Sequence, residues 1–190
     1  MPGILRVDQA NVDYIYAKTA GGTTYIPGHV VQVVHTYLTA TSAISMTAGA
    51  AVTTDISGLS ASITPKSTSS KIYMTVRWFG EFGSGDGAYN AMFGVKRNGS
   101  AIGLVTNTYG FTAAAQSYTY TDASSTPEML FMDYYDSPAS VSSLTYQVYV
   151  GFLSSSQTLY TNRTVSDSGG GASTGYERGT SSITLMEIAQ

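Results

Sequence analysis

The chain has 190 residues, a length that fits one domain, and 11% of them are charged. The net charge of −3 and the absence of a basic run argue against a nucleic-acid partner. It contains no cysteine, which excludes disulfides and thiolate metal sites. Its apolar fraction of 43% and its 15 tyrosines favour a folded β-protein over a disordered chain. No apolar run approaches the roughly 20 residues that cross a bilayer, so we expect no membrane insertion. The absence of cysteine fits a product made in a reducing cytosol. The first residues lack the pattern of a signal peptide.

Residues 1–28 differ from the rest of the chain, because their apolar side chains are scattered among polar ones. Gly21–Gly22 and Pro27–Gly28 interrupt this segment. We interpret it as an N-terminal arm that packs on another chain; the alternative is a terminus that is disordered or packs on its own domain. The candidate anchoring residues are Ile4, Leu5, Val7, Tyr14, Ile15 and Tyr16. Residues 29–190 would then form the folded domain.

The first predicted strand covers residues 29–38, where valines on both faces predict burial on both sides. His29 and His35 share a face but lie roughly 20 Å apart along a strand, too far for one metal ion. We therefore predict no metal site. Residues 40–51 predict a loop or a weak edge strand. Residues 55–64 predict a strand pair or one bent strand, with a bulge or bend at Gly58.

The rest of the chain is expected to wrap around the stretch from Ser62 to Phe79. Pro65 should end the preceding strand, and residues 66–70 form a polar loop. An alternating strand follows, with Lys71, Tyr73, Thr75 and Arg77 on its polar face. Its inward residues are Ile72, Met74, Val76 and Trp78. Trp78 is the only tryptophan, and we expect it at the centre of the core.

Glycines and turn residues mark the next connections. The four glycines within residues 80–87 predict a flexible hairpin connection, since neither a Lys-Ser/Thr pair nor a helix follows as in a phosphate loop. Asn98–Gly99, between strands at 88–96 and 101–105, predicts a type I′ turn.

The second half of the chain continues the pattern of short strands. Strands are predicted at 128–135, 144–152, 159–165 and 181–188, with a turn at 136–139 and a loop at 166–175. No segment predicts an amphipathic helix. Nine or ten strands separated by turns predict an all-β, jelly-roll-like antiparallel sandwich. Few charges protect the edges of its sheets, which predicts a symmetric oligomer.

Three segments resemble a known family. They read Gly-His-Val-Val-Gln-Val-Val at 28–34, Asp-Ile-Ser-Gly-Leu-Ser-Ala-Ser-Ile-Thr-Pro at 55–65 running on into Ser-Ser-Lys-Ile at 69–72, and Tyr-Glu-Arg-Gly-Thr-Ser-Ser-Ile-Thr-Leu-Met-Glu-Ile at 176–188. With the opening Gly-Ile-Leu-Arg-Val-Asp at 3–8, they resemble small structural proteins of tailed bacteriophages, especially those of marine and cyanobacterial hosts. The middle of the chain, residues 80–163, matches none of the family's motifs.

The resemblance implies a homotrimeric jelly-roll knob on the virion, made in the host cytoplasm and bound to other virion proteins. The knob would be either a tail fibre tip or a head decoration, and the absence of a long repetitive shaft favours a short knob or a decoration. The excess of tyrosine favours contact with a host surface polysaccharide. The candidate glycan-contact residues are Tyr109, Phe111, Tyr118 and Tyr120. The alternative is a non-catalytic carbohydrate-binding module of cellular origin.

The sequence gives little support for an enzyme, and neither catalytic residues nor a cofactor is predicted. The acidic candidates are Glu81, Asp86, Asp122, Glu128, Asp133 and Asp136. A glycosidase needs two carboxylates about 5 to 9.5 Å apart across a groove. Asp133 and Asp136 have opposite parity, and Pro138 places Asp136 at a turn, so we interpret both as turn-formers or solvated charges. No nucleophile-elbow sequence is present.

Overall fold

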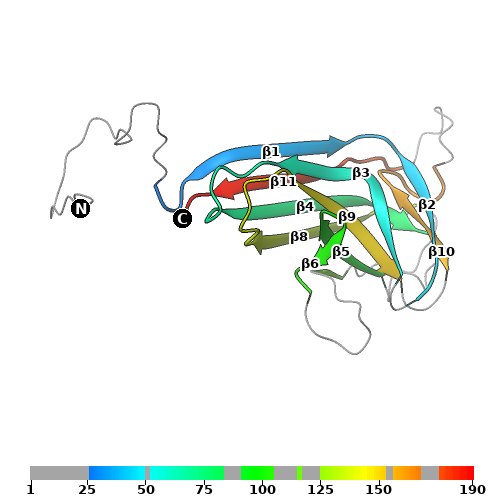
Figure 1. The fold of residues 1–190 in the computed structure, drawn as a ribbon. Helices are drawn as coiled ribbons and strands as arrows, with labels where there is room; N and C mark the ends of the chain where they lie inside the picture. The colour runs from blue at the N-terminus through cyan, green and yellow to red at the C-terminus, as the bar shows by residue number, and fades with distance from the viewer. Residues whose placement is uncertain are drawn as a thin grey trace, which may run out of the picture.

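A computed structural model of the chain describes residues 26–49, 52–83, 91–104, 115–116, 125–152, 156–167 and 176–190. These residues contain no helix, and their antiparallel strands form two sheets that pack as a sandwich (Figure 1). The strands are β1 (Val30–Leu38), β2 (Ser42–Met46), β3 (Thr53–Ile63), β4 (Lys71–Phe82), β5 (Ala91–Arg97), β6 (Ser100–Ile102), β7 (Ala115–Gln116), β8 (Glu128–Asp136), β9 (Leu144–Phe152), β10 (Gln157–Thr161) and β11 (Ser181–Ile188). The predicted all-β antiparallel sandwich is confirmed, and its jelly-roll connectivity stays a prediction.

The first sheet, sheet A, is built around β4. Along one edge, β4 pairs with β8 from Ile72 to Gly80. Along the other edge, it pairs with β11 over residues 71–77 and with β10 over residues 80–82, so β11 and β10 lie end to end. β1 lies beyond β11, and β2 lies beyond β10. The stretch that carries the strongest alternation in the sequence is therefore the strand with the most neighbours in sheet A.

The second sheet, sheet B, has the order β3-β9-β5-β6, with β7 also paired to β5. The predicted bend in β3 is confirmed, because the register with β9 shifts between Asp55 and Ser60. Gly58 lies inside this bulge with a φ of +80°, a value that glycine adopts at little cost. The side-chain amide of Gln147 donates a 2.9 Å hydrogen bond to the carbonyl of Ile56. The bulge is thereby fixed to the neighbouring strand.

The hairpin between β5 and β6 is the one that the Asn-Gly pair predicts. Asn98 and Gly99 have φ values of +48° and +84°, as a type I′ turn requires. The side-chain oxygen of Asn98 also accepts a 2.8 Å hydrogen bond from the backbone N–H of Thr145. The turn is therefore attached to the start of β9.

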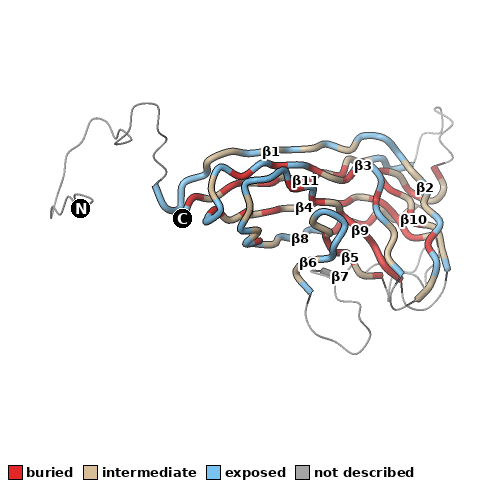
Figure 2. The backbone as a smooth tube through the Cα atoms, viewed as in Figure 1, coloured by how far each residue is buried: buried red, intermediate tan, exposed pale blue. Residues whose placement is uncertain are grey.

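The core lies between the two sheets and contains the inward residues that alternation predicts. Ile72, Met74, Val76 and Trp78 are all buried. The Trp78 ring lies 5.0 Å from that of Phe93 in sheet B and 5.7 Å from that of Phe82, between ring centroids. Figure 2 shows buried positions recurring along β4, β9 and β11, whereas β1 is mostly exposed or intermediate.

Two predictions about strand environments are wrong. β1 is not covered on both sides: it lies at the edge of sheet A, and Val33 and Tyr37 are 55% and 63% exposed. Gly80 is not part of a flexible connection, because β4 continues to Phe82. A Cβ atom at Gly80 would lie 2.0 Å from the carbonyl oxygen of Tyr160, so glycine is needed here for close packing of two strands. Residues 84–87 of that predicted connection lie outside the described residues.

Asn162 directly follows β10 and lies where the end of β10 meets the start of β11 along the edge of β4. It is fully buried, with a φ of +62°. Its side-chain amide donates hydrogen bonds of 2.7 Å and 2.9 Å to the carbonyls of Leu38, at the end of β1, and Ala40, in the connection to β2. Its side-chain oxygen accepts a 2.8 Å hydrogen bond from the Ser181 hydroxyl. One side chain thus joins the two halves of sheet A.

The described N-terminal end of the domain is attached to its C-terminal end. The N–H of Gly28 donates a 2.8 Å hydrogen bond to the carbonyl of Ala189, whose N–H donates a 2.9 Å bond to the carbonyl of His29. Residues 1–25 of the predicted arm lie outside the described residues. The division into an arm at 1–28 and a domain at 29–190 stays a prediction.

Candidate functional site

The site residues predicted from the sequence fall outside the described residues. This holds for the anchoring candidates Ile4, Leu5, Val7, Tyr14, Ile15 and Tyr16, and for the glycan-contact candidates Tyr109, Phe111, Tyr118 and Tyr120. Both sets stay predictions. In the described part of the chain, two other features are candidates for function: a polar cluster around Asp136 and the outer face of sheet A.

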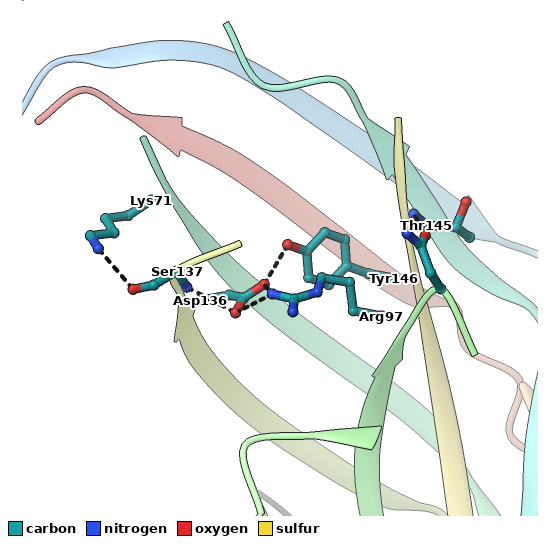
Figure 3. Close-up of polar contacts among 7 residues, drawn as sticks. Lys71, Arg97, Asp136, Ser137, Thr145 and Tyr146 are labelled. Carbon is teal, nitrogen blue, oxygen red and sulfur yellow. Dashed lines mark hydrogen bonds and ion pairs between the residues drawn. The ribbon is translucent and has the colours of Figure 1, made fainter. Parts of the chain in front are cut away.

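The polar cluster around Asp136 joins the two sheets near one end of the sandwich (Figure 3). Asp136 ends β8 in sheet A, and its two oxygens accept hydrogen bonds of 2.8 Å and 2.7 Å from Nη1 of Arg97 in sheet B. The Tyr146 hydroxyl, also from sheet B, donates a 2.7 Å bond to Asp136 Oδ2. The backbone N–H of Ser137 donates a fourth bond of 2.8 Å. The interpretation of Asp136 as a solvated charge or simple turn-former is wrong, because its carboxylate is buried and bonded to both sheets.

Register explains why these groups meet. Arg97 of β5 lies opposite Tyr146 of β9, so both side chains reach Asp136 from neighbouring positions of sheet B. Parity in the sequence identifies Asp136 as an inward residue of β8, since Leu130 and Met132 point inward as well. The sequence near Asp136 does not reveal which cation pairs with it, because Arg97 is 39 residues away.

The electrostatics of the cluster favour a structural role. Burial, followed by the hydrogen bond to Asp136, raises the pKa of Tyr146 far above its ordinary value. The hydrogen bond to Asp136 also raises the pKa of Arg97. Tyr146 therefore stays protonated and Arg97 stays charged throughout the neutral range. Neither group is suited to proton transfer near pH 7, and the carboxylate is occupied by four hydrogen bonds.

Glu187 is a second buried carboxylate near the same end. Both Glu187 and Asp136 lie opposite Ile72, one on each side of β4. Glu187 accepts bonds of 2.6 Å from the Gln32 side chain and 2.7 Å from the N–H of Lys66. Burial alone would raise the pKa of Glu187, but the hydrogen bonds from Gln32 and from residues 66–70 outweigh it, and the pKa is lowered. This carboxylate fixes the loop before β4.

Two further buried carboxylates hold loops at the opposite end of β4. Glu81 accepts hydrogen bonds from the N–H groups of Thr126, at 3.0 Å, and Val165, at 2.5 Å. Asp167 accepts bonds of 2.5 Å and 2.9 Å from the guanidinium of Arg178. Each is occupied by groups of the chain itself, which is the arrangement expected of structural carboxylates.

The outer face of sheet A is the second candidate. It consists of the side chains of β1, β11, β4 and β8 that point away from sheet B, and cross-strand pairing arranges them in rows. One row is apolar and aromatic: Val33, Met186, Tyr73 and Tyr135 lie opposite one another in turn. Tyr135 is 49% exposed, and its ring lies 6.4 Å from that of Tyr73.

The next row along the strands is polar. It runs from His35 through Thr184 and Thr75 to Asp133. Nδ1 of His35 lies 2.7 Å from the Thr184 hydroxyl. Asp133 is exposed, as predicted, and no described residue bonds to its side chain. The row therefore has an imidazole at one edge of the sheet and a carboxylate at the other.

The third row returns to aromatic side chains at both edges. It runs from Tyr37 through Ser182 and Arg77 to Phe131, which is 67% exposed. Arg77 donates a 2.7 Å hydrogen bond to the Thr180 hydroxyl. Alternation within β4 predicts that Tyr73, Thr75 and Arg77 share a polar, partly aromatic face, and this is confirmed. Which strands continue the face depends on pairing between segments that are tens to more than a hundred residues apart, which no local pattern reveals.

Within the described ranges, no group of three or more His, Asp or Glu side chains is arranged to hold a metal ion. The same residues include no helix that is long and apolar enough to cross a membrane. Comparison with protein-family models and with curated proteins finds no match to this chain.

Proposed function

We propose that this protein is a non-catalytic structural protein of a bacteriophage virion, forming a homotrimeric knob that is anchored by its N-terminal arm. The knob is either the tip of a tail fibre or a head decoration, located on the virion after synthesis in the host cytoplasm. Its partners are copies of itself and other virion proteins, and its tyrosine-rich segment at 107–121 contacts surface glycans of the host.

One observation carries this proposal. The phage-like motifs are far apart in the sequence but neighbours in the fold: residues 28–34 enter β1, residues 176–188 contain β11, and residues 69–72 begin β4. These three strands are adjacent in sheet A, in the order β1-β11-β4 (Figure 1). The remaining motif, residues 55–65, covers most of β3 in sheet B, which lies against β1 and β11. The resemblance thus falls on strands that are neighbours in the sandwich, as expected of a shared scaffold.

Two properties of the described residues support a structural role. The carboxylates of Glu81, Asp136, Asp167 and Glu187 are occupied by hydrogen bonds that fix loops or join sheets. Exposed apolar side chains gather on the outer face of sheet A, which suits assembly with other protein surfaces.

Labelling of particles tests the virion role. Antibodies against the recombinant chain should bind purified particles of the phage that encodes it, at the tail tip or on the head, when viewed by electron microscopy. Mass spectrometry of the same particles should detect the chain. Its absence from washed particles would refute the proposal.

Deletion of residues 1–28 tests whether the arm provides the attachment to the particle while residues 29–190 fold without it. The truncated domain should remain folded, with a nearly unchanged melting temperature, yet fail to enter particles. Entry of the truncated domain would show that another surface provides the attachment. Loss of folding would show that the arm is part of the sandwich.

A carbohydrate-binding module of cellular origin is the alternative. It predicts specific binding on a glycan array together with absence from any particle. Alanine substitution of Tyr109, Phe111, Tyr118 and Tyr120 tests the glycan contact in either setting, because it should abolish retention on the glycan that the wild type binds.

A further inference from the structure

The outer face of sheet A is more apolar than an exposed sheet face usually is. Val33, Tyr37, Met129, Phe131 and Tyr135 are each between 49% and 67% exposed. They lie on β1 and β8, at the two edges of the face, and all but Met129 belong to the rows described above. Monomeric proteins rarely expose contiguous apolar patches of more than a few hundred Å². A partner surface is therefore expected here.

We propose that this face packs against the same face of a second copy of the chain, with the β1 edge of one copy against the β8 edge of the other. This inference rests on the self-association within the proposed function, and it specifies the surface through which the copies associate. It does not depend on the virion role.

Complementarity of donor and acceptor within the polar row identifies the partner as a second copy, because an imidazole N–H can donate to a carboxylate. His35 lies at the β1 end of that row and Asp133 at the β8 end. A symmetry axis parallel to the strands keeps each row at the same height and reverses its order. His35 of one copy then faces Asp133 of the other. Because Nδ1 of His35 is engaged by Thr184, Nε2 is the nitrogen left for that carboxylate.

The two apolar rows are complementary under the same operation. Tyr37 of one copy faces Phe131 of the other, and Val33 faces Tyr135. Each edge therefore meets an aromatic or aliphatic side chain in addition to the polar pair. In the third row, Arg77 faces the Ser182 hydroxyl, so that a donor meets an acceptor.

The size of the face is sufficient for a specific interface. With four strands about 4.8 Å apart and about 3.3 Å per residue along the 9 residues of β8, the face covers roughly 570 Å². Two such faces remove roughly 1,100 Å² from solvent, above the ~1,000 Å² that a specific interface requires. A twofold axis parallel to the strands places the two faces against each other and closes a dimer. A threefold axis instead turns each face toward the axis, so that its β1 edge meets the β8 edge of the next copy.

A charge-exchange series on the full chain tests the proposal. Sedimentation velocity over a range of concentrations should give two or three times the chain mass of 20.0 kDa for the wild type. His35→Glu places two carboxylates opposite each other, and Asp133→Lys places a cation opposite His35. Each single variant should raise the dissociation constant at least tenfold. The double variant restores an opposite pair and should return to within about threefold of the wild type.

Two further variants distinguish an effect on association at this face from an effect on folding or on the surface in general. Phe131→Ser should also raise the dissociation constant at least tenfold, and because its side chain is 67% exposed, the melting temperature of the dissociated chain should change little. Val141→Glu alters a side chain that is 51% exposed and lies outside the sheets, and should leave association unchanged.

Three outcomes would overturn the proposal. A wild type that is monomeric at all concentrations would refute the self-association itself. A stable oligomer that tolerates both charge changes and Phe131→Ser would place the interface elsewhere and leave the oligomer intact. Retention of a monomer on a polysaccharide, lost in Phe131→Ser, would assign the face to a glycan. Particle labelling is a separate measurement, so failure of the virion role stays distinguishable from failure of this interface.

Discussion

The indole N–H of Trp78 donates a 3.0 Å hydrogen bond to the hydroxyl of Thr161 in the interior of the sandwich. Both side chains are fully buried, and they belong to β4 and β10 of the same sheet. A buried indole needs an acceptor, because an unpaired N–H in an apolar core costs the free energy of its lost hydration. Thr161 therefore allows the largest side chain of the core to be buried completely.

Replacement of Trp78 by alanine should lower the free energy of unfolding by about 3–5 kcal/mol, because it removes the aromatic contacts and leaves a cavity. Urea denaturation followed by circular dichroism measures this loss. In the wild type, the single tryptophan should show blue-shifted emission and weak quenching by iodide. Strong quenching would contradict its position in the core.

Thr161→Val tests the hydrogen bond separately from the packing, since valine keeps the shape and removes the acceptor. We expect a loss of about 1–3 kcal/mol in the free energy of unfolding. In a Trp78→Phe background, which has no indole N–H, the same substitution should cost much less. Equal costs in the two backgrounds would show that the hydrogen bond contributes nothing to stability.

Asp136→Asn should destabilise the domain by about 3 kcal/mol, because it leaves the Arg97 guanidinium without its anionic partner between the two sheets. Asp55→Asn is the matched control. Asp55 pairs with Lys96, the neighbour of Arg97 in the sequence, at 2.5 Å, but its side chain is 49% exposed. The control should cost less than about 1 kcal/mol. Similar losses in the two variants would contradict the structural importance of the Asp136 cluster.

Asn162→Asp should be strongly destabilising, because the carboxylate would face the carbonyls of Leu38 and Ala40 where the amide now donates two hydrogen bonds. Asparagine and aspartate both tolerate the positive φ, so this change isolates the hydrogen bonds. We expect a loss of at least about 2 kcal/mol in the free energy of unfolding. Asn162→Gly, which keeps the backbone conformation and removes the side chain, should cost less; the reverse order would contradict this role.

Stability should fall in acid in a way that depends on Glu187. Its pKa is lowered in the folded protein, so the unfolded chain binds a proton more readily as the pH falls. The stabilisation is complete above the ordinary pKa of about 4.5 and is lost as the pH falls through the lower folded value. Glu187→Gln should therefore be less stable than the wild type at pH 7, with a difference that shrinks below about pH 4. Urea denaturation at pH 7 and pH 3.5 measures both differences, and a constant difference would refute the linkage.

Local sequence pattern determined the elements of this protein. The alternation of Ile72, Met74, Val76 and Trp78 predicted a strand and its buried face, because the period of two in a strand is a local property. Asn98–Gly99 predicted its turn for the same reason: positive φ at both positions depends on these residues alone. The bend at Gly58 belongs to this class as well.

Tertiary structure alone decided which strands are neighbours and what each polar residue does. The valine-rich pattern of β1 predicted burial on both faces, but the strand lies at a sheet edge, and hydrophobicity does not specify position in a sheet. Asp136 looked like a turn residue until pairing placed Arg97 and Tyr146 beside it. Gly80 was predicted to be flexible, but in the fold it packs closely against the carbonyl of Tyr160. These roles arise from contacts between segments tens of residues apart, which only the folded chain brings together.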